Sequence, residues 1–563
     1  MLHLDKKHDP RRNAFLIEKF SHHKGNLKTA IQETDELFDS LSNTAISEVM
    51  HSGSNINRFP FLFKKLGLGL VRSIATVSAH TPLTPYKTIA DSREEVYPEW
   101  KSMLDDEYKQ LQKEIHREVN ILHCGAIGDG LTDNTDAFKK AIGHGRVKVI
   151  VPEGVFITKG IRLPSWTCLV GEGKGKSTIK LSDSAPKGMR LVTNSNHWRG
   201  NHHISVEALS LDWNIERLGD VQKTSTWGNH SSCLTYANVT CGWVKNVEGI
   251  NPGLHCFDVS STFYDYSGDG YRARGGSQYV WLDRLNGYGF GDDGITTHHS
   301  DNIFISNCHM SDPSGRAHAK GFSNSNGIEV DDGSRNVWLV HNSTTRCFGG
   351  VEVKAHHTSS AGNNVQIVGH LSVNDNRSYN FRHIGHHKEA DPDSKTASNI
   401  RATKIISINP VDTELYKGST PRAMVVSAYK NVVINQFTII GDQEYDYRGN
   451  PVVAVQYKAR NITLNSVSIR GFHSAGADIK IFGGKQHADQ IALRNIYVED
   501  SAQHAIDIGQ GVAKIAVENI KALSTSGTYA IKAVHPPAEL KGIYTEGYRL
   551  PAFINGKEYR TFS

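Results

Sequence analysis

The residues best suited to chemistry gather in three short stretches in the middle of the chain. FGDDGITTHHS begins at Phe290, NGIEVDDGS at Asn326 and GGVEVKAHH at Gly349. Neighbouring carboxylates raise each other's pKa or recruit a cation, and nearby His and Lys transfer protons or hold negative charge. Such a group could act as acid and base on a glycosidic bond. It could also activate water and neutralise charge at a phosphodiester.

The spacing of these stretches predicts that they stack on one another. GIEVDDGS and GGVEVKAH align with Ile328 on Val351, 23 positions apart, and GYRARGGS from Gly270 aligns with GITTHHS from Gly294, 24 positions apart. A repeat of about two dozen residues made of short strands is typical of a β-solenoid. A leucine-rich repeat would show its Leu/Asn pattern, and a propeller blade would need a longer period.

Alternation along the strands then predicts which side chains share a face. If Ile295, Ile328 and Val351 point into the core, an outward column holds Thr296, Glu329 and Glu352. A second outward column holds Arg274, His298, Asp331 and Lys354, with successive coils ~4.8 Å apart. The segment from His309 to Asn326 is longer than a coil needs, so it is expected to form a loop beside this face.

This face is the candidate site. The residues expected to act as acid or base or to bind a cation are Asp292, Asp293, Glu329, Asp331 and Asp332. The residues expected to contact substrate are His298, Lys354, Glu352, Arg272, Arg274 and Arg382. A divalent cation at the carboxylates is the one cofactor that the pattern suggests. The alternative is that outward charges are only solvated and that Asp-Gly marks turns.

The N-terminal part of the chain shows a different sequence periodicity. Residues from Asn26 to Met50 show helical periodicity, and so do those from about Pro98 to Val119. In the second helix Leu104, Tyr108, Leu111 and Ile115 form an apolar stripe, which suits either a short coiled coil or packing within the chain's own domain. We therefore expect a helical region over 1–118, a β-solenoid over 119–550 and a tail over 551–563.

Composition narrows the classes of partner. A formal charge of +5 with 29 His is too mild for a nucleic-acid binder, yet it tolerates a polyanionic substrate. The seven cysteines show no metal-binding or disulfide spacing, so they are expected to be buried apolar residues. The apolar stretch from Phe59 to Val77 is interrupted by lysines and Arg72, so it does not predict a membrane span. The first residues show no secretory signal, so an extracellular protein of this kind would be released by lysis.

Two further stretches resemble a known superfamily. CGAIGDGLTDNTDAFKKAI, from Cys124 to Ile142, and LVGEGKGKSTI resemble the opening of the pectate-lyase-like β-helix superfamily. The resemblance implies a right-handed parallel β-helix, in which Gly128 to Asp133 turns into a helix that caps the tube. Asp129 and Asp133 are accordingly expected to be structural. Asp292 and Asp293 resemble the acid and base of pectin hydrolases, although the residues around them differ.

The central stretches, with RSYNFRHIGHH and the N-terminal HDPRRNAFLIEKFSHHKGNLKTAI, resemble preneck appendage (tailspike) proteins of short-tailed phages of Gram-positive bacteria. This resemblance implies a homotrimer on the virion, joined to neck or tail proteins through its N-terminal region. It also implies that the β-helix binds wall teichoic acid of the host and hydrolyses it. The alternatives are a glycosidase or lyase acting on a capsular sugar, and a receptor-binding spike without catalysis.

Overall fold

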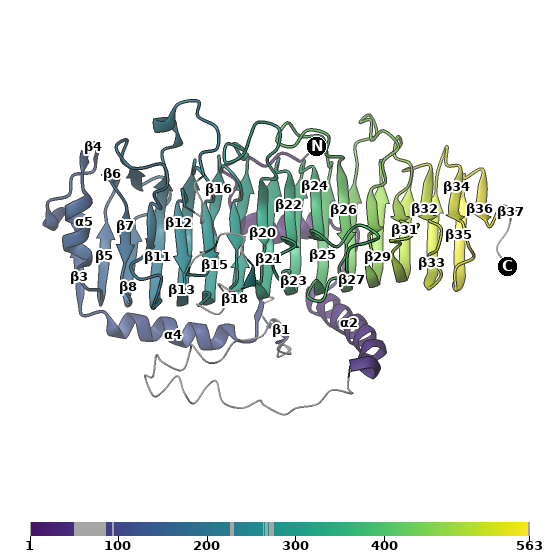
Figure 1. Ribbon diagram of the computed structural model, residues 1–563, viewed down its shortest axis with the longest axis horizontal. Coiled ribbons are helices and arrows are strands. Elements are labelled where there is room, and N and C mark those ends of the chain that lie inside the picture. The colour runs from purple at the N-terminus through teal and green to yellow at the C-terminus, as the bar shows by residue number, and fades with distance from the viewer. Residues whose placement is uncertain are drawn as a thin grey trace.

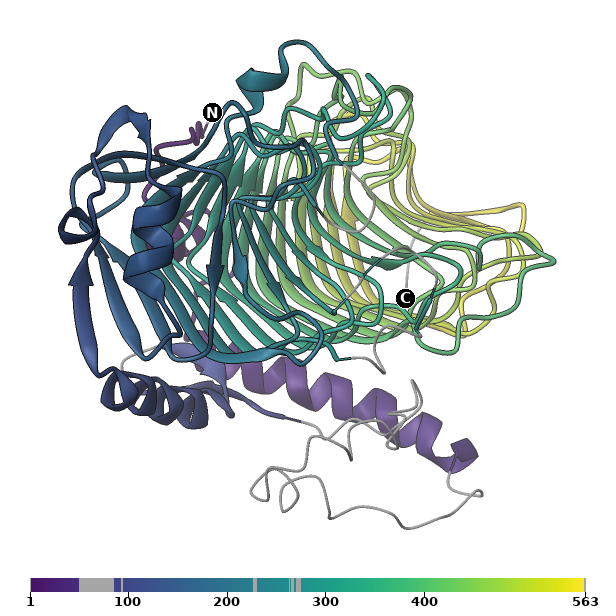
Figure 2. The ribbon, with the colours of Figure 1, turned by 60° about the vertical axis from the view of Figure 1, so that its left-hand side comes forward.

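The computed structural model describes residues 2–49, 86–92, 95–225, 230–262, 264, 268–269 and 275–560, with the backbone alone for 42–49. From residue 117 onward the described chain is a tube of stacked parallel strands (Figure 1). Viewed obliquely along the tube, equivalent strands nest behind one another from coil to coil (Figure 2). This is the predicted parallel β-helix.

One sheet, called sheet 1, runs the length of the tube on one face. Its strands, in spatial order, are β7 (Ile161–Leu163), β10 (Val192–Asn194), β12 (Leu234–Ala237), β14 (Phe257–Ser260), β17 (Ile295–Thr297), β20 (Asn326–Val330), β22 (Gly349–Ala355), β24 (Arg377–His383), β26 (Arg422–Ser427), β28 (Val453–Gln456), β30 (Ile479–Ile481), β32 (His504–Ile508), β34 (Tyr529–Ala533), β36 (Leu550–Ile554) and β37 (Lys557–Tyr559). All neighbours pair in parallel except β36 and β37.

The other strands of the tube, called sheet 2, are mostly longer. They are β3 (Arg117–Asn120), β4 (Asp129–Asp133), β5 (Val147–Val151), β6 (Gly154–Thr158), β8 (Thr167–Gly171), β9 (Ser177–Leu181), β11 (Asn201–Asp212), β13 (Val239–Ile250), β15 (Gln278–Asp283), β16 (Asn286–Tyr288), β18 (Asp301–Ser306), β19 (His309–Ser311), β21 (Arg335–Thr345), β23 (Asn363–Val373), β25 (Ser398–Ile408), β27 (Lys430–Ile440), β29 (Arg460–Arg470), β31 (Asp489–Glu499), β33 (Ile515–Leu523) and β35 (Glu539–Glu546).

The long strands of sheet 2 bend at one residue near their middle. In β11 that residue is Ala208 with φ 54°, in β21 it is His341 with φ 52°, and in β27 it is Gln436 with φ 59°. The paired ladder skips this position, as between β11 and β13. The left-handed residue near the middle of each of these strands therefore divides it into two faces, which complete the tube together with sheet 1.

The inside of the tube is an apolar stack. Ile295, Ile328 and Val351 are fully buried in one continuous core, as the alternation predicts. Helix α5 (Thr135–Ile142) buries Phe138 and Ala141 on the N-terminal end of that core (Figure 1). The capping helix implied by the resemblance is thus present, and the carboxylate of Asp129 serves the turn before it by accepting from the Thr132 backbone.

The N-terminal helices lie against sheet 2. α1 (Asn13–Phe20) packs on β23 and β25, α2 (Leu27–Val49) on β25 and β27, and α4 (Lys101–Glu114) on β11 and β13, while β1 (Thr88–Ala90) pairs with β2 (Val96–Pro98). The expected helix from Asn26 to Met50 is confirmed as α2. The second predicted helix is real but ends at Glu114, because the chain enters β3 soon afterwards.

The stripe on α4 packs on its own chain rather than forming a coiled coil. Leu104 and Leu111 are fully buried in a cluster with Trp243 and Trp338 of the tube. All seven cysteines are free, and six of them are buried, as predicted. None of the described helices is both long and apolar enough to cross a membrane.

Candidate functional site

The predicted outward column exists in sheet 1. Thr296 of β17 pairs with Glu329 of β20, and Glu329 pairs with Glu352 of β22. Ile328 and Val351 are register partners 23 positions apart, as the alignment predicts. Next to them, Lys354 pairs with Arg382 of β24. The repeat therefore places the central carboxylates on adjacent rungs of one face.

The alignment of the coil before β17 is wrong. We expected the segment from Gly270 to pair with β17, but β14 does so, with Phe257 opposite Ile295 and Asp258 opposite Thr296. Phe257 fills the core at this level, so the core position is already taken by a strand 38 positions upstream. The columns therefore hold Asp258 where the alignment placed Arg272. Arg272 and Arg274 lie outside the described residues.

Acidic and basic groups alternate across four rungs of sheet 1. His255 Nδ1 lies 3.9 Å from Asp258 Oδ2, and His298 Nδ1 lies 3.6 Å from Asp258 Oδ1. His298 Nε2 lies 3.5 Å from Asp331 Oδ2. Lys354 Nζ then lies 3.8 Å from the same Asp331 oxygen and 2.7 Å from Glu329 Oε1. We call these groups, with the others that adjoin them, the charged patch. Its members are His255, Asp258, Asp292, Asp293, His298, His318, Glu329, Asp331, Asp332, Glu352 and Lys354.

Asp292 and Asp293 are adjacent carboxylates with oppositely shifted pKa values. Burial raises the pKa of Asp293 well above its ordinary value, and the charges of Asp292 and Glu329 raise it further. Burial would also raise the pKa of Asp292, but His318 and His255 hold it well below the ordinary value. His318 Nε2 lies 2.9 Å from Asp292 Oδ1. The pKa values of the two carboxyl groups are thus shifted in opposite directions, as in an acid–base pair.

The pKa values of Glu329 and Asp331 are likewise shifted in opposite directions. Burial raises the pKa of Glu329, although Lys354 opposes this. For Asp331 burial acts in the same direction, but Lys354 and His298 outweigh it and hold its pKa below the ordinary value. Burial would lower the pKa of His298, yet Asp258 and Asp331 raise it to about 10. His298 is therefore a cation fixed between two anions.

Asp332 and Glu352 complete the patch on either side. Burial and the charge of Asp331 raise the pKa of Asp332 to about 7, and Tyr264 donates its hydroxyl to Asp332 Oδ2 at 2.7 Å. Glu352 accepts from Asn380 Nδ2 at 2.8 Å and forms an ion pair with Arg382. These contacts order the border of the patch.

Access to the patch is uneven. The side chains of His298, Glu329 and Asp331 are each 3% exposed. His318 is 35% exposed, Arg382 23% and Asp292 12%. His318 comes from the connection between β19 and β20, so the predicted loop does stand beside this face. A substrate reaching the patch would first meet Asp292, His318 and Arg382.

Three groups of side chains in the described residues have the composition of a metal site. Two lie in the charged patch, namely His255 with Asp292 and Asp293, and His298 with Glu329 and Asp331; the third, Glu107 with His203 and Cys241, lies on sheet 2. In the second group the Lys354 ammonium already sits 2.7 Å from Glu329, and His298 is protonated. Among the described residues no ammonium is paired with the carboxylates of the first group. Burial would lower the pKa of His255, but Asp258 and Asp292 raise it, so a divalent cation there would have to displace the His255 proton.

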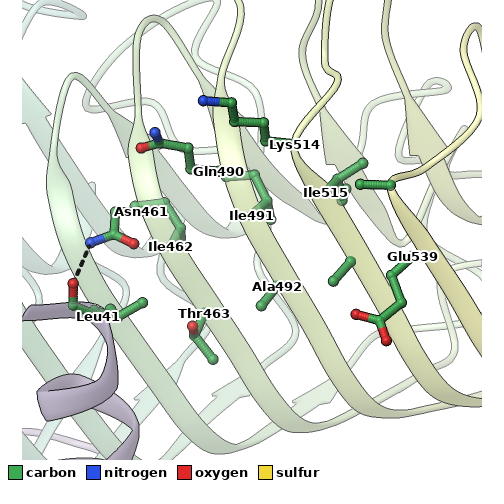
Figure 3. A pocket seen from close by; sticks show the side chains of 12 residues that line it. Leu41, Asn461, Ile462, Thr463, Gln490, Ile491, Ala492, Lys514, Ile515 and Glu539 are labelled. Carbon is green, nitrogen blue, oxygen red and sulfur yellow. Dashed lines mark hydrogen bonds between the residues drawn. The ribbon is translucent and has the colours of Figure 1, made fainter. Parts of the chain in front are cut away.

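Two hollows lie on sheet 2, away from the charged patch. One of about 1140 Å³ lies between α1 and the tube and includes Trp281 and Phe304. The other, of about 550 Å³, lies beside Leu41 of α2 and is floored by Ile462, Ile491 and Ile515 (Figure 3). Acidic and basic residues do line the larger hollow, but Lys404 is paired with Glu18 and Arg284 with Asp283. The coupled carboxylates of the charged patch therefore remain the stronger candidate site.

Sequence reasoning missed three members of the patch. His255 and Asp258 belong to the coil whose alignment is wrong, and His318 sits in a loop whose position no periodicity encodes. The sequence does carry a signal for the first two, because CFDVS alternates apolar and polar residues around Asp258. No comparable signal exists for His318.

Comparison with known proteins agrees with the fold. The family described as "Rhamnogalacturonase A/epimerase, pectate lyase-like" matches residues 118–352, and its name includes a polysaccharide-degrading enzyme. The chain is 48% identical to "Putative phage-related protein YobO" of Bacillus subtilis (strain 168), over 82% of this chain and 57% of that protein. It is 38% identical to "Pre-neck appendage protein" of Bacillus phage phi29, over 81% of this chain and 52% of that protein.

The solved N-terminal fragment of gene product 12 of bacteriophage phi29 superposes with a TM-score of 0.72. It is 37% identical, and the match covers 78% of this chain and 73% of that fragment. The chain spans about half the length of the curated relatives it matches. The homologues named pre-neck appendage protein are virion components, as the resemblance implied. With its right-handed parallel β-helix and this degree of identity, the chain belongs to the family of phage pre-neck appendage proteins.

Proposed function

We propose that this protein is a virion appendage that adsorbs to the host cell wall and hydrolyses wall teichoic acid. The observation that carries the proposal is the Asp292–Asp293 pair, whose pKa values are shifted in opposite directions and which lies beside the partly exposed His318. Environments that shift the pKa values of two neighbouring carboxyl groups in opposite directions are typical of acid–base sites.

The roles follow from charge and exposure. Asp292, ionised at neutral pH, takes a proton from the attacking water. Oxygen from that water bonds to phosphorus, and the P–O bond to the leaving oxygen breaks. The leaving oxygen takes a proton from Asp293, whose pKa burial and the neighbouring carboxylates raise well above its ordinary value. His318 and Lys354 stabilise the negative charge on the phosphoryl oxygens.

A polyanionic substrate fits the cations at the rim. Arg382 and His318 are the more exposed bases of the patch, and the resemblance to appendages of phages of Gram-positive bacteria points to a glycerol- or ribitol-phosphate chain. His298 and Asp331, by contrast, are enclosed by other members of the patch. We expect them to position Lys354 and Asp258 rather than to touch the polymer.

Attachment to the phage particle is assigned to the N-terminal region. Helices α1, α2 and α4 cover sheet 2 and leave sheet 1 uncovered, so the same subunit could bind neck or tail proteins on one side and polymer on the other. A homotrimer is proposed from the family resemblance alone.

The test is incubation of the purified chain with isolated wall teichoic acid. Release of glycerol phosphate or ribitol phosphate supports the proposal. Release of reducing sugar would replace it with a glycosidase, and an unsaturated product would replace it with a lyase. Tight binding without any shortening of the polymer would support the alternative of a receptor-binding spike without catalysis.

A divalent cation is proposed at His255, Asp292 and Asp293 only. If one is bound there, dialysis against a chelator should abolish hydrolysis, and Mn²⁺ or Ca²⁺ should restore it. Unchanged turnover after chelation would show that the carboxyl groups act with their own basic neighbours.

A further inference from the structure

Beside the charged patch, sheet 1 carries a second column of side chains at the start of its strands. Asn326, Gly349, Arg377 and Arg422 occupy equivalent positions on β20, β22, β24 and β26. Asn326 touches the patch directly, because its carboxamide donates to Glu329 at 2.8 Å and to Asp293 at 3.1 Å. The column therefore leads away from the patch along the axis of the tube.

Two arginines occupy neighbouring positions at the far end of this column. Arg377 and Arg422 are register partners on adjacent strands, and like charges directly opposite each other are destabilising. Burial, together with the neighbouring Arg377, lowers the pKa of Arg422 to about 10. Such a pair is costly unless something negative lies against it.

The described residues supply no anion for this pair within ion-pair distance. Arg377 Nε is buried without a hydrogen-bond partner, and Arg422 donates only to the Pro451 carbonyl, at 3.2 Å. Glu352, the nearest acidic influence on Arg377, is already bound to Arg382 and Asn380. Two donors for an oxyanion are therefore available one rung beyond the patch.

Aromatic residues border the same place. Arg377 lies 5.7 Å from the ring centre of Phe348, and Tyr416 packs on Phe348 at 5.2 Å. Tyr416 is 37% exposed, and a β-bridge joins it to Phe322 in the loop that carries His318. The loop that carries His318 is thus connected to the aromatic residues Phe348 and Tyr416 beside the arginines.

We propose that Arg377 and Arg422 form a subsite for an anionic group of the polymer, so that the bound chain runs along the tube axis from the charged patch towards β26. This inference rests on the proposed function and deepens it. Rungs are ~4.8 Å apart, so Arg377 and Arg422 lie two and three rungs from Asn326, roughly 10 to 15 Å along the axis. Only a polymer of several repeats reaches both places. The shared chemistry is an oxyanion, from either a phosphodiester or a uronate.

The test measures binding in an Asp292→Asn background, which stops turnover. Glycerol-phosphate oligomers of two and of six repeats are titrated against the full chain and against the double variant Arg377→Gln/Arg422→Gln. We expect the hexamer to bind at least about tenfold more weakly to the double variant, with a shallower salt dependence, because each charge-assisted contact contributes on the order of 1.5 kcal/mol or more. The dimer, which fills the patch alone, should bind equally to both.

Matched controls separate this subsite from general charge and from folding. Arg470→Gln/Lys521→Gln removes the same charge from exposed positions on sheet 2 and should leave hexamer binding unchanged. Arg377→Lys/Arg422→Lys keeps the charge and should recover much of the affinity even if the Gln variant unfolds. Equal hexamer binding by the Gln variant and its parent would overturn the inference, and so would an equal loss by the control.

A second arm identifies the source of the oxyanion. The phosphodiester is supported if the double Gln variant loses affinity for the glycerol-phosphate hexamer and an oligogalacturonate of equal length does not bind. If only the oligogalacturonate responds to the two arginines, the subsite stands and teichoic acid is the wrong polymer. If the arginines matter for binding but no hydrolysis occurs in the unmodified protein, the proposed function fails while the subsite survives.

Discussion

Two regions of sheet 1 contain the same kind of ion pair in different surroundings. In the charged patch, Lys354 lies 2.7 Å from Glu329, and their side chains are 8% and 3% exposed. Near the C-terminal end, Lys480 lies 2.6 Å from Asp507, and theirs are 30% and 13% exposed. Distance and chemistry are alike, and only the degree of burial differs.

The connections between coils explain the difference. Around the patch, Phe257 and Ile295 are register partners 38 positions apart, and Ile295 and Ile328 are 33 apart. In the C-terminal coils, Ile479 and Ile506 are only 27 apart. Tyr264 of the first connection contacts Asp332, and His318 of the second contacts Asp292, and a lower local dielectric strengthens charge–charge interactions in such buried surroundings. The same strand positions thus carry either a partly solvated ion pair or a buried one according to what covers them.

The sharpest way to break this comparison is to remove one carboxylate from each region. Asp292→Asn should lower the rate of teichoic acid hydrolysis by about 10²- to 10⁴-fold, because it removes the ionised acid–base partner. Asp507→Asn, in the C-terminal coils, should leave the rate within about twofold, since an exposed pair contributes little. Phosphate-ester release under saturating polymer measures both, and circular dichroism confirms that each variant folds. Equal effects of the two substitutions would refute our site assignment.

Removing the lysine from each pair tests the role of burial in stability. Lys354→Met leaves Glu329 and Asp331 buried without their cation, which should cost about 3–5 kcal/mol of unfolding free energy. Lys480→Met should cost under about 1 kcal/mol. Denaturant unfolding near neutral pH measures both values.

The loss in Lys354→Met should also depend on pH. At pH 5 the penalty should shrink, because Glu329 can then take up a proton and become neutral. A penalty that is equal in the two regions, or independent of pH, would mean that burial of the patch does not matter.

The smallest expected effect concerns His318, the group that the loop adds to the patch. Its charge holds the pKa of Asp292 down despite burial. In His318→Ala that pKa should rise, so the acidic limb of the pH–rate profile should move to higher pH by about one unit. The sign follows because Asp292 acts when ionised. An unshifted acidic limb would assign the base to another residue, whereas a matched change at His473, which lies outside the patch, should leave the profile unaltered.

Much of the fold could be predicted because a tube repeats itself. The step from Ile328 to Val351 contains little beyond one coil, so simple alignment finds the register. The register between β14 and β17 could not be found in this way, because its partners Phe257 and Ile295 are 38 positions apart. The alignment matched the glycines of GYRARGGS instead. The coiled-coil option for α4 failed for a different reason: its stripe meets Trp243 and Trp338, which are distant in sequence.

The site was predictable in its residue types but not in its electrostatics. Alternation brings Glu329, Asp331 and Lys354 to one face, and the structure places them within ion-pair distance. Alternation does not predict that Asp258 and His298 are buried, or that His318 reaches the patch from a loop. Ionisation depends on those contacts, so the opposite pKa shifts of Asp292 and Asp293 emerge only from the folded chain.

The left-handed residue near the middle of the long strands of sheet 2 has a consequence for how such molecules diversify. It sets the cross-section of the tube independently of the segments that join one coil to the next. Insertions can accumulate in those segments without disturbing the stack, as the 45 positions between the register partners Tyr379 and Met424 illustrate. The connecting segments and the tube can therefore change at separate rates, with new surfaces added to an unaltered frame.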